Sequence, residues 1–215
     1  MSSLWQFRHL LLEGALLTVE LAAVSIALGT VLGVLVGGSL LARVPSLRWG
    51  GRIYTDVVRG IPSLVLLFAI YYGSTAFGKG LNPIAASICA LGLFCAAQVG
   101  ENIRGAVSSV PSLTVDAARM LGLGAVGRIR YVIVPLAIGR ILPSWVNTAV
   151  EILKGTSLAS LIGAQEFLFE LQNGAGVTFT PVPFYLAGGA MYLIAGVLLS
   201  SLSRSLERRF RFYEY

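Results

Sequence analysis

The sequence predicts an all-α membrane protein of about five transmembrane helices, on the grounds of its composition and its pattern of charge. Of the 215 residues, 56% are hydrophobic and 12% are charged, and the mean hydropathy is +0.80. This balance leaves too little polar surface to cover a water-soluble globule of that size. We therefore expect the lipid bilayer to surround most of the chain.

Several charge-free stretches reach the length of roughly 20 residues that a helix needs to cross the hydrocarbon core of a bilayer. They are residues 21–42, 60–78, 81–100 and 182–203. The first helix is expected to begin near Leu11 and to carry Glu20 close to the membrane surface. Because residues 1–17 lack a basic region before their apolar run and a small-residue cleavage site, we expect this terminus to be retained.

A further span is expected over residues 141–171, although polar and helix-breaking residues interrupt it. These are Pro143, Glu151, Lys154 and Glu166. Counting this segment gives five spans, an odd number that places the two ends of the chain on opposite sides of the membrane.

Basic side chains gather on one side of the predicted spans. Arginine clusters follow the first, third and last spans, whereas only Arg8 and Lys79 fall on the other side, and residues 171–184 contain no Lys or Arg. Because cytoplasmic loops carry the excess of Lys and Arg, we expect the N-terminus outside and the C-terminus in the cytoplasm. The 16 basic residues are dispersed among loops, so the net charge of +6 does not indicate a nucleic-acid partner.

Residues suited to catalysis or metal binding are few. Cys89 and Cys95 lie six positions apart on one predicted helix and face different directions, which disfavours a disulfide or a metal site. His9 is the only histidine and lies near the terminus, which disfavours a histidine-based triad and excludes a multi-histidine metal site. The segment GSTAFGKG at 73–80 resembles a phosphate-binding loop, but Gly80 stands where Ser or Thr is needed. We expect no catalytic residue, metal or cofactor in this chain.

The longest segment between spans, residues 105–135, is too short for an independent domain, so we expect one domain over residues 1–215. Residues 110–136 within it form a polar, glycine-punctuated loop that the charge pattern places in the cytoplasm. A short surface helix is expected in this loop.

Asp116 is expected near the start of the loop helix, where a carboxylate meets the positive end of the helix dipole, with Ser112 or Thr114 as its cap. Gly122 and Gly124 are expected to end the helix by adopting positive φ. The small Ala117 and Ala118 keep one side slim, and Met120 and Leu121 offer apolar contact. Such a helix is shaped to dock in a partner's groove.

The run DAARMLG at 116–122, with Pro135 downstream, closely resembles the EAA loop of ABC importer permeases. In that family the loop forms the coupling helix, which sits in a cleft of the ATPase subunit and transmits its closure. The resemblance implies an ATPase-coupling role for Asp116, Ala117, Ala118, Met120, Leu121 and Gly122.

Other stretches resemble the polar amino acid branch, the histidine/glutamine type, of these permeases. They are residues 18–33, VVRGIPSLVLLFAIYYG at 57–73, ENIRGAVSSVP at 101–111 and KGTSLASLIG at 154–163. The chain departs from the family pattern at Asp116, where Glu is usual, at Leu113 and Thr114, where Gly-Gln is frequent, and at Gly155, where Asp is usual.

The resemblance implies the type I ABC importer permease fold and an inner-membrane subunit that forms half of a pathway for polar amino acids. It also implies a second permease chain, identical or homologous, two ATPase subunits that bind ATP and magnesium, and an external substrate-binding protein. The chain itself is then not an enzyme. The alternative is a secondary transporter or channel without an ATPase, for which inverted repeats are expected and none is evident. A membrane-embedded enzyme is disfavoured because no nucleophile–base pair is apparent.

Charged and hydroxyl-bearing residues in or near the spans are the candidate pathway or substrate residues. They are Glu101, Glu151, Lys154, Thr156 and Ser157. Glu151 and Lys154 share a helix face and are expected to pair, either lining a wet pathway or locking helices together. Glu101 and Arg104 repeat this spacing at the end of a span, where a structural ion pair is favoured.

Gly155 is expected to loosen its helix together with the hydroxyl-bearing Thr156 and Ser157. Since the usual Asp is absent at 155, the neighbourhood of Lys154 is left more positive unless Glu151 compensates. We therefore predict either a neutral or acidic substrate, or a heteromeric pair in which the other permease chain supplies the acidic group.

Overall fold

The computed structural model describes residues 2–76, 78 and 80–210, and all regular elements in these residues are helical. This confirms the predicted all-α fold. The elements are α1 (Ser2–Gln6), α2 (Arg8–Leu40), α3 (Pro45–Gly60), α4 (Ser63–Ala76), α5 (Pro83–Ser108), α6 (Ser112–Met120), α7 (Ala125–Arg128), the π-helix η1 (Ile129–Ile133), α8 (Val134–Gly155), the 3₁₀ helix η2 (Thr156–Ile162), α9 (Phe167–Thr178) and α10 (Pro181–Phe210).

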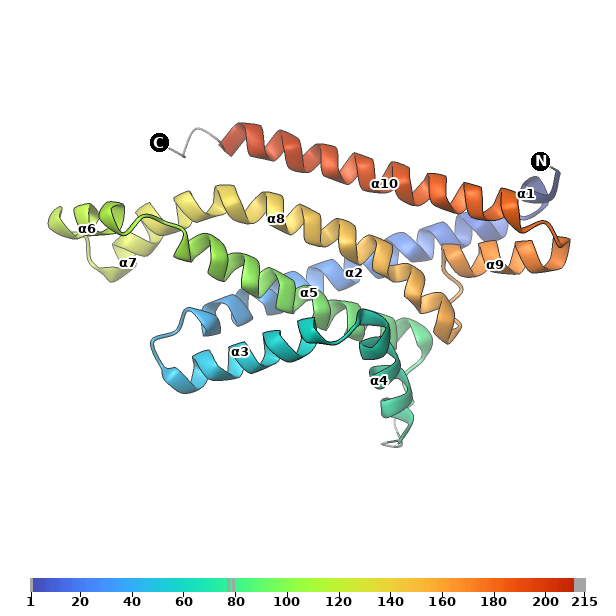
Figure 1. Ribbon diagram of the computed structural model, residues 1–215, viewed down its shortest axis with the longest axis horizontal. Coiled ribbons are helices and arrows are strands. Elements are labelled where there is room, and N and C mark those ends of the chain that lie inside the picture. Colours follow the sequence, from blue (N-terminus) through green and yellow to red (C-terminus); the bar gives the residue numbers. More distant parts are fainter. Residues whose placement is uncertain (1, 77, 79, 211–215) are drawn as a thin grey trace.

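The long helices lie along one another in an elongated bundle (Figure 1). The short helices α6 and α7 lie at one end of the bundle, and α1 and α9 lie at the other. The C-terminal end of α10 lies toward the α6 end, whereas α2 begins at the α9 end. The side of the membrane on which each terminus lies stays a prediction.

Three helices in the described part of the chain are long and apolar enough to cross a membrane: α2, α5 and α10 over Pro181–Ser205. A fourth counts only if α3 and α4 are taken together, and this pair bends by 103°. The span predicted over residues 60–78 is longer than the helix found there. That helix, α4, has only 14 residues, which corresponds to about 21 Å of helix rise. Pro62 explains the break, since its ring disfavours a helical Ile61 and α3 ends at Gly60.

The predicted bounds of the interrupted span, 141–171, are wrong. α8 ends at Gly155, and the chain continues through η2, a left-handed Gly163 with φ 87, and α9. Pro143, which was expected to interrupt the helix, lies inside α8. α8 is 22 residues long but is not among the helices that meet the length and composition criteria for a span. The count of five spans therefore stays a prediction.

The centre of the bundle is the contact between α2 and α5, which is made through small residues. A Cβ built on Gly33 of α2 would lie 2.6 Å from the Cβ of Val99 on α5, and one built on Gly29 would meet Cys95. Lipid supplies no hydrophobic force between helices, so close van der Waals packing of this kind holds spans together. Cys95 is buried in this contact.

The outward faces of the spans are apolar. Large hydrophobic side chains are exposed along α2 and α10, among them Leu16, Leu35, Leu186 and Leu198. Monomeric soluble proteins rarely expose apolar surface on this scale. These faces are therefore suited to contact lipid or other membrane subunits.

Candidate coupling loop and translocation residues

The segment between α5 and α8 carries α6, α7 and η1 and lies at one end of the bundle (Figure 1). Three of its apolar side chains are almost fully exposed: Leu113 at 81%, Met120 at 90% and Leu121 at 83%. Met120 and Leu121 were predicted as contact residues, whereas Leu113 was noted only as a departure from the family pattern. We call the exposed apolar side chains of Leu113, Met120 and Leu121 the docking surface; their contact with an ATPase stays a prediction.

The start of α6 differs from the prediction. Pro111 is the N-cap, and no side chain caps the helix, because Ser112 already occupies its first position. Asp116 lies beyond the first turn, where it interacts little with the helix dipole. Its Oδ1 lies 3.1 Å from Nη1 of Arg119, and both side chains remain more than half exposed. An exposed ion pair of this kind contributes little stability. Because both side chains are exposed, the Asp116 carboxylate is accessible to a partner.

The end of α6 confirms the prediction for Gly122, which has φ +79. The N–H of Gly122 donates to the carbonyl of Arg119 at 3.0 Å, and the N–H of Leu123 donates to that of Ala118 at 3.1 Å. This is a Schellman turn, which requires a left-handed residue at the position of Gly122. The same prediction for Gly124 is wrong, because Gly124 has φ −64 and ψ 171 and serves as the N-cap of α7.

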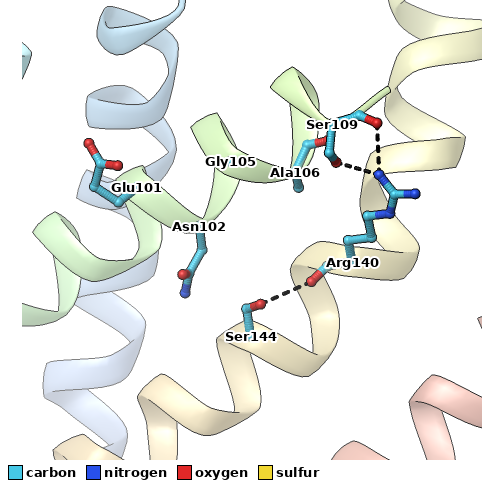
Figure 2. Close-up of a pocket in the computed structure, with 7 residues that line it drawn as sticks. All are labelled: Glu101, Asn102, Gly105, Ala106, Ser109, Arg140 and Ser144. Carbon is cyan, nitrogen blue, oxygen red and sulfur yellow. Dashed lines mark hydrogen bonds between the residues drawn. The ribbon is translucent and has the colours of Figure 1, made fainter. Parts of the chain in front are cut away.

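Below the loop, a cavity of about 260 Å³ lies between α5 and α8 (Figure 2). Its lining residues are Glu101, Asn102, Gly105, Ala106, Ser109, Arg140 and Ser144. Nδ2 of Asn102 donates to Oγ1 of Thr148 at 3.1 Å, and Oγ of Ser144 donates to the carbonyl of Arg140 at 3.2 Å. Polar side chains of both helices therefore border the cavity. Among the lining residues, only Glu101 was a predicted site residue.

Glu101 and Arg104 form the predicted ion pair. Nε and Nη2 of Arg104 donate to Oε2 of Glu101 at 2.9 and 2.7 Å. Nη1 of Arg59, on α3, lies 3.9 Å from the same oxygen. The Glu101 carboxylate therefore ties the end of α3 to the end of α5, which favours the structural role expected for it.

Glu151 and Lys154 do not form the predicted pair. Among the described residues, no ion pair joins them. Oε2 of Glu151 accepts a hydrogen bond from Nε2 of Gln98 on α5 at 3.3 Å, whereas the Lys154 side chain runs beside Gly196 of α10. Glu151 therefore contacts α5 and Lys154 lies beside α10. The spacing of the two residues in the sequence did not reveal these neighbours. Their role in a pathway stays a prediction.

The helix loosens after Lys154, as predicted, because α8 ends at Gly155 and η2 follows. The hydroxyls of Thr156 and Ser157 donate to the carbonyls of Leu153 and Lys154, each at 2.7 Å, and Thr156 is fully buried. In this conformation both hydroxyls bond to the helix's own backbone. A Cβ on Gly155 would lie 3.1 Å from Cδ2 of Leu91, so close packing against α5 is one reason for glycine here.

Glu166 was treated in the sequence only as an interruption of a span, yet it is the most connected carboxyl group in the described residues. Its Oε2 accepts hydrogen bonds from Oγ1 of Thr18 and from the Tyr192 hydroxyl, each at 3.1 Å. Its Oε1 accepts one from the N–H of Phe169 at 3.0 Å, which caps α9. Glu is not among the residues preferred as N-caps, so the sequence carried no clear signal for this role.

Comparison with known proteins gives matches over nearly the whole chain. A protein-family model of binding-protein-dependent transport system inner membrane components matches residues 29–212. The nopaline transport system permease protein NocQ of Agrobacterium fabrum is 36% identical over 206 residues, which cover 90% of this chain and 86% of NocQ. The histidine/lysine/arginine/ornithine transport system permease protein HisQ of Escherichia coli is 32% identical over 220 residues, which cover 96% of each chain.

Solved structures show the same fold. A crystal structure of an amino acid ABC transporter with histidines superposes with a TM-score of 0.92 at 29% identity, covering 96% of this chain and 97% of that one. An inward-facing MetNI methionine ABC transporter gives a TM-score of 0.76 at 20% identity, covering 94% and 96%. Together with the α6 loop and the apolar spans, these matches show that the chain belongs to the family of binding-protein-dependent transport system inner membrane components.

Proposed function

We propose that this chain is a permease subunit of an ATP-driven ABC importer for polar amino acids and forms half of its translocation pathway. The observation that carries the proposal is the docking surface of Leu113, Met120 and Leu121, which is almost fully exposed at one end of the bundle. A short helix with an unpartnered apolar face suits a groove on another protein. Because the sequence has no complete phosphate-binding motif of its own, we assign that groove to an ATPase subunit.

The arrangement of helices supports a simple route for the coupling motion. From Ala125 to Gly155 the chain is helical without interruption through α7, η1 and α8. Residues 121–124 connect α6 to this helical run, so a displacement of α6 by a closing ATPase would reach α8 through them and be carried to its end at Gly155. Beyond that point the chain changes to η2, so movement of α8 would reach the pathway at the segment that contains Lys154 and Thr156.

The remaining subunits follow from geometry and from the relatives. Three or four spans by length and composition, or the predicted five, are too few to enclose a pathway, so a second permease chain, identical or homologous, completes it. Two ATPase subunits, which bind ATP and magnesium, lie on the cytoplasmic side. An external binding protein delivers the substrate at the other side, where the N-terminus of this chain lies.

A polar amino acid is the substrate class that the comparisons support. The system of HisQ is named for histidine, lysine, arginine and ornithine, and the structural relative is an amino acid transporter. In this chain Lys154 has no carboxylate at position 155, and Glu151 is hydrogen-bonded to Gln98. We therefore retain two options: a neutral or acidic substrate, or a heteromeric pair in which the partner permease supplies the acidic group.

Affinity purification of the intact complex through a tag on this chain tests the proposal. We expect ATP-binding-cassette ATPase subunits and a permease chain to co-purify, and mass spectrometry to identify a bound amino acid. The matched control is a chain with Leu113, Met120 and Leu121 replaced by serine, which should insert normally and lose the ATPase subunits. Full substrate uptake by the chain without any ATPase would instead support a secondary transporter or channel.

A further inference from the structure

The loop that carries α6 is closed at its base by one side chain, Arg140. From α8, Nη1 of Arg140 donates to the carbonyl of Ser109 at 2.9 Å and also contacts the Ser109 hydroxyl (Figure 2). Ser109 is the C-cap of α5, and Pro111, the N-cap of α6, follows shortly after it. The contact spans 31 positions of the chain and joins the residue where the loop begins to the helix that follows the loop.

The chemistry of the contact is suited to holding a helix end. The last carbonyls of an α-helix have no partner within the helix and carry partial negative charge. A guanidinium group stays charged and presents several donors in a fixed plane. The Ser109 hydroxyl donates to the carbonyl of Ala106 at 2.7 Å, which leaves its lone pairs to face Arg140. Arg140 therefore binds the end of α5 through two oriented acceptors.

Other polar contacts do not replace this one. The bond between Asn102 and Thr148 also joins α5 to α8, but both residues lie farther from the loop along their helices. Within residues 110–136, as far as the structure describes them, the polar side-chain contacts are local, such as Nη1 of Arg128 donating to the carbonyl of Leu123 at 2.9 Å. Among the side-chain hydrogen bonds of the described residues, only those of Arg140 join the segment between Ser109 and α6 to α8.

We propose that Arg140 is a positioning residue for ATPase coupling, which fixes the start of the α6 loop to α8 so that α6 and α8 move as one unit. This inference rests on the proposed function. When the tie is lost, α6 is joined to α8 only through α7 and η1, so part of a displacement of α6 is absorbed by bending between Ser109 and Pro111. The ATPase subunits still bind, because the docking surface of Leu113, Met120 and Leu121 does not include Arg140.

The test measures amino acid uptake and ATP hydrolysis in the same proteoliposomes containing the whole complex. Arg140→Met keeps much of the apolar stem and loses every donor. We expect the ATP hydrolysed per amino acid to rise at least about fivefold, the lower end of ordinary coupling between sites, while the ATPase subunits still co-purify. Arg140→Lys, which retains one charged donor group, should recover part of the ratio.

Two matched variants separate the contact from its surroundings. Ser109→Ala removes one of the two acceptors and keeps the carbonyl, so it should raise the ratio less than Arg140→Met does. Ser144→Ala, whose hydroxyl lines the same cavity but bonds only within α8, should stay near the wild-type ratio. A wild-type ratio in Arg140→Met overturns the proposal. Should that variant not insert, Arg140→Gln, which stays polar but is shorter, is measured in the same way, and a wild-type ratio overturns the proposal there too. Absence of ATP-dependent uptake in the wild-type complex would count against the proposed function instead.

Discussion

Gly122, which ends α6, offers a perturbation whose effect can be worked out from the backbone. It has φ +79, and a Cβ built on it meets nothing within 4 Å. The Cβ of a valine at this position would therefore meet no neighbour, and we attribute the cost of the substitution to conformational strain. For residues other than glycine the left-handed region costs about 1–2 kcal/mol, with β-branched residues among the least tolerant.

A cost of about 1–2 kcal/mol changes a two-state equilibrium roughly 5- to 30-fold. In Gly122→Val this change favours conformations in which the Schellman turn is undone and Met120 and Leu121 are displaced. Gly124 provides a matched control, because a Cβ there also meets nothing within 4 Å, but its φ is −64 and its ψ is 171. A β-branched residue adopts that extended conformation without strain.

The assay is substrate-stimulated ATPase activity and uptake by the reconstituted complex at matched expression. We expect Gly122→Val to lower both activities by at most roughly 5- to 30-fold, the change in the equilibrium constant, and Gly124→Val to stay near wild type. Gly122→Asn should recover part of the loss, because asparagine tolerates the left-handed region. Equal activities in the two valine variants would refute the role assigned to the turn.

Three further predictions concern orientation, packing and selectivity. With the native cysteines replaced, a single cysteine introduced beside Gly124 should react only from the cytoplasmic side, and labelling of intact cells by an impermeant reagent would overturn the orientation. Gly33→Leu should separate α2 from α5, since a Cβ there lies 2.6 Å from that of Val99. Overpacking costs about 1–3 kcal/mol, so the purified Gly33→Leu complex should aggregate at a lower temperature than the Gly38→Leu complex. Gly38 is the control because a Cβ there meets nothing within 4 Å. Equal aggregation temperatures would count against the packing argument. Gly155→Asp should shift relative uptake toward basic amino acids, and a homo-oligomeric complex that already prefers arginine or lysine would show that Gly155 was over-interpreted.

The features that the sequence predicted well depend on local chemistry. The apolar runs of α2, α5 and α10 are long enough to identify spans by composition alone. The left-handed turn at Gly122 and the ion pair of Glu101 with Arg104 each involve residues only a few positions apart. In these cases the partners are fixed by the backbone geometry of one helix, so their spacing in the chain is sufficient.

The features that were missed depend on neighbours that only the fold brings together. Glu166 receives its hydrogen bonds from Thr18 and Tyr192, which lie on two other helices. Helical spacing alone paired Glu151 with Lys154, but each side chain lies along a different neighbouring helix. The contact of Arg140 with Ser109 likewise required knowing that α8 returns along the end of α5.

Uptake by the complete complex in proteoliposomes tests the central claim most directly. The complex is reconstituted with its ATPase subunits, the external binding protein is added outside, and ATP or a non-hydrolysable analogue is enclosed within. The account predicts that labelled polar amino acids accumulate only when hydrolysable ATP and the ATPase subunits are both present. Accumulation that proceeds equally without ATP, driven by an ion gradient alone, would contradict it.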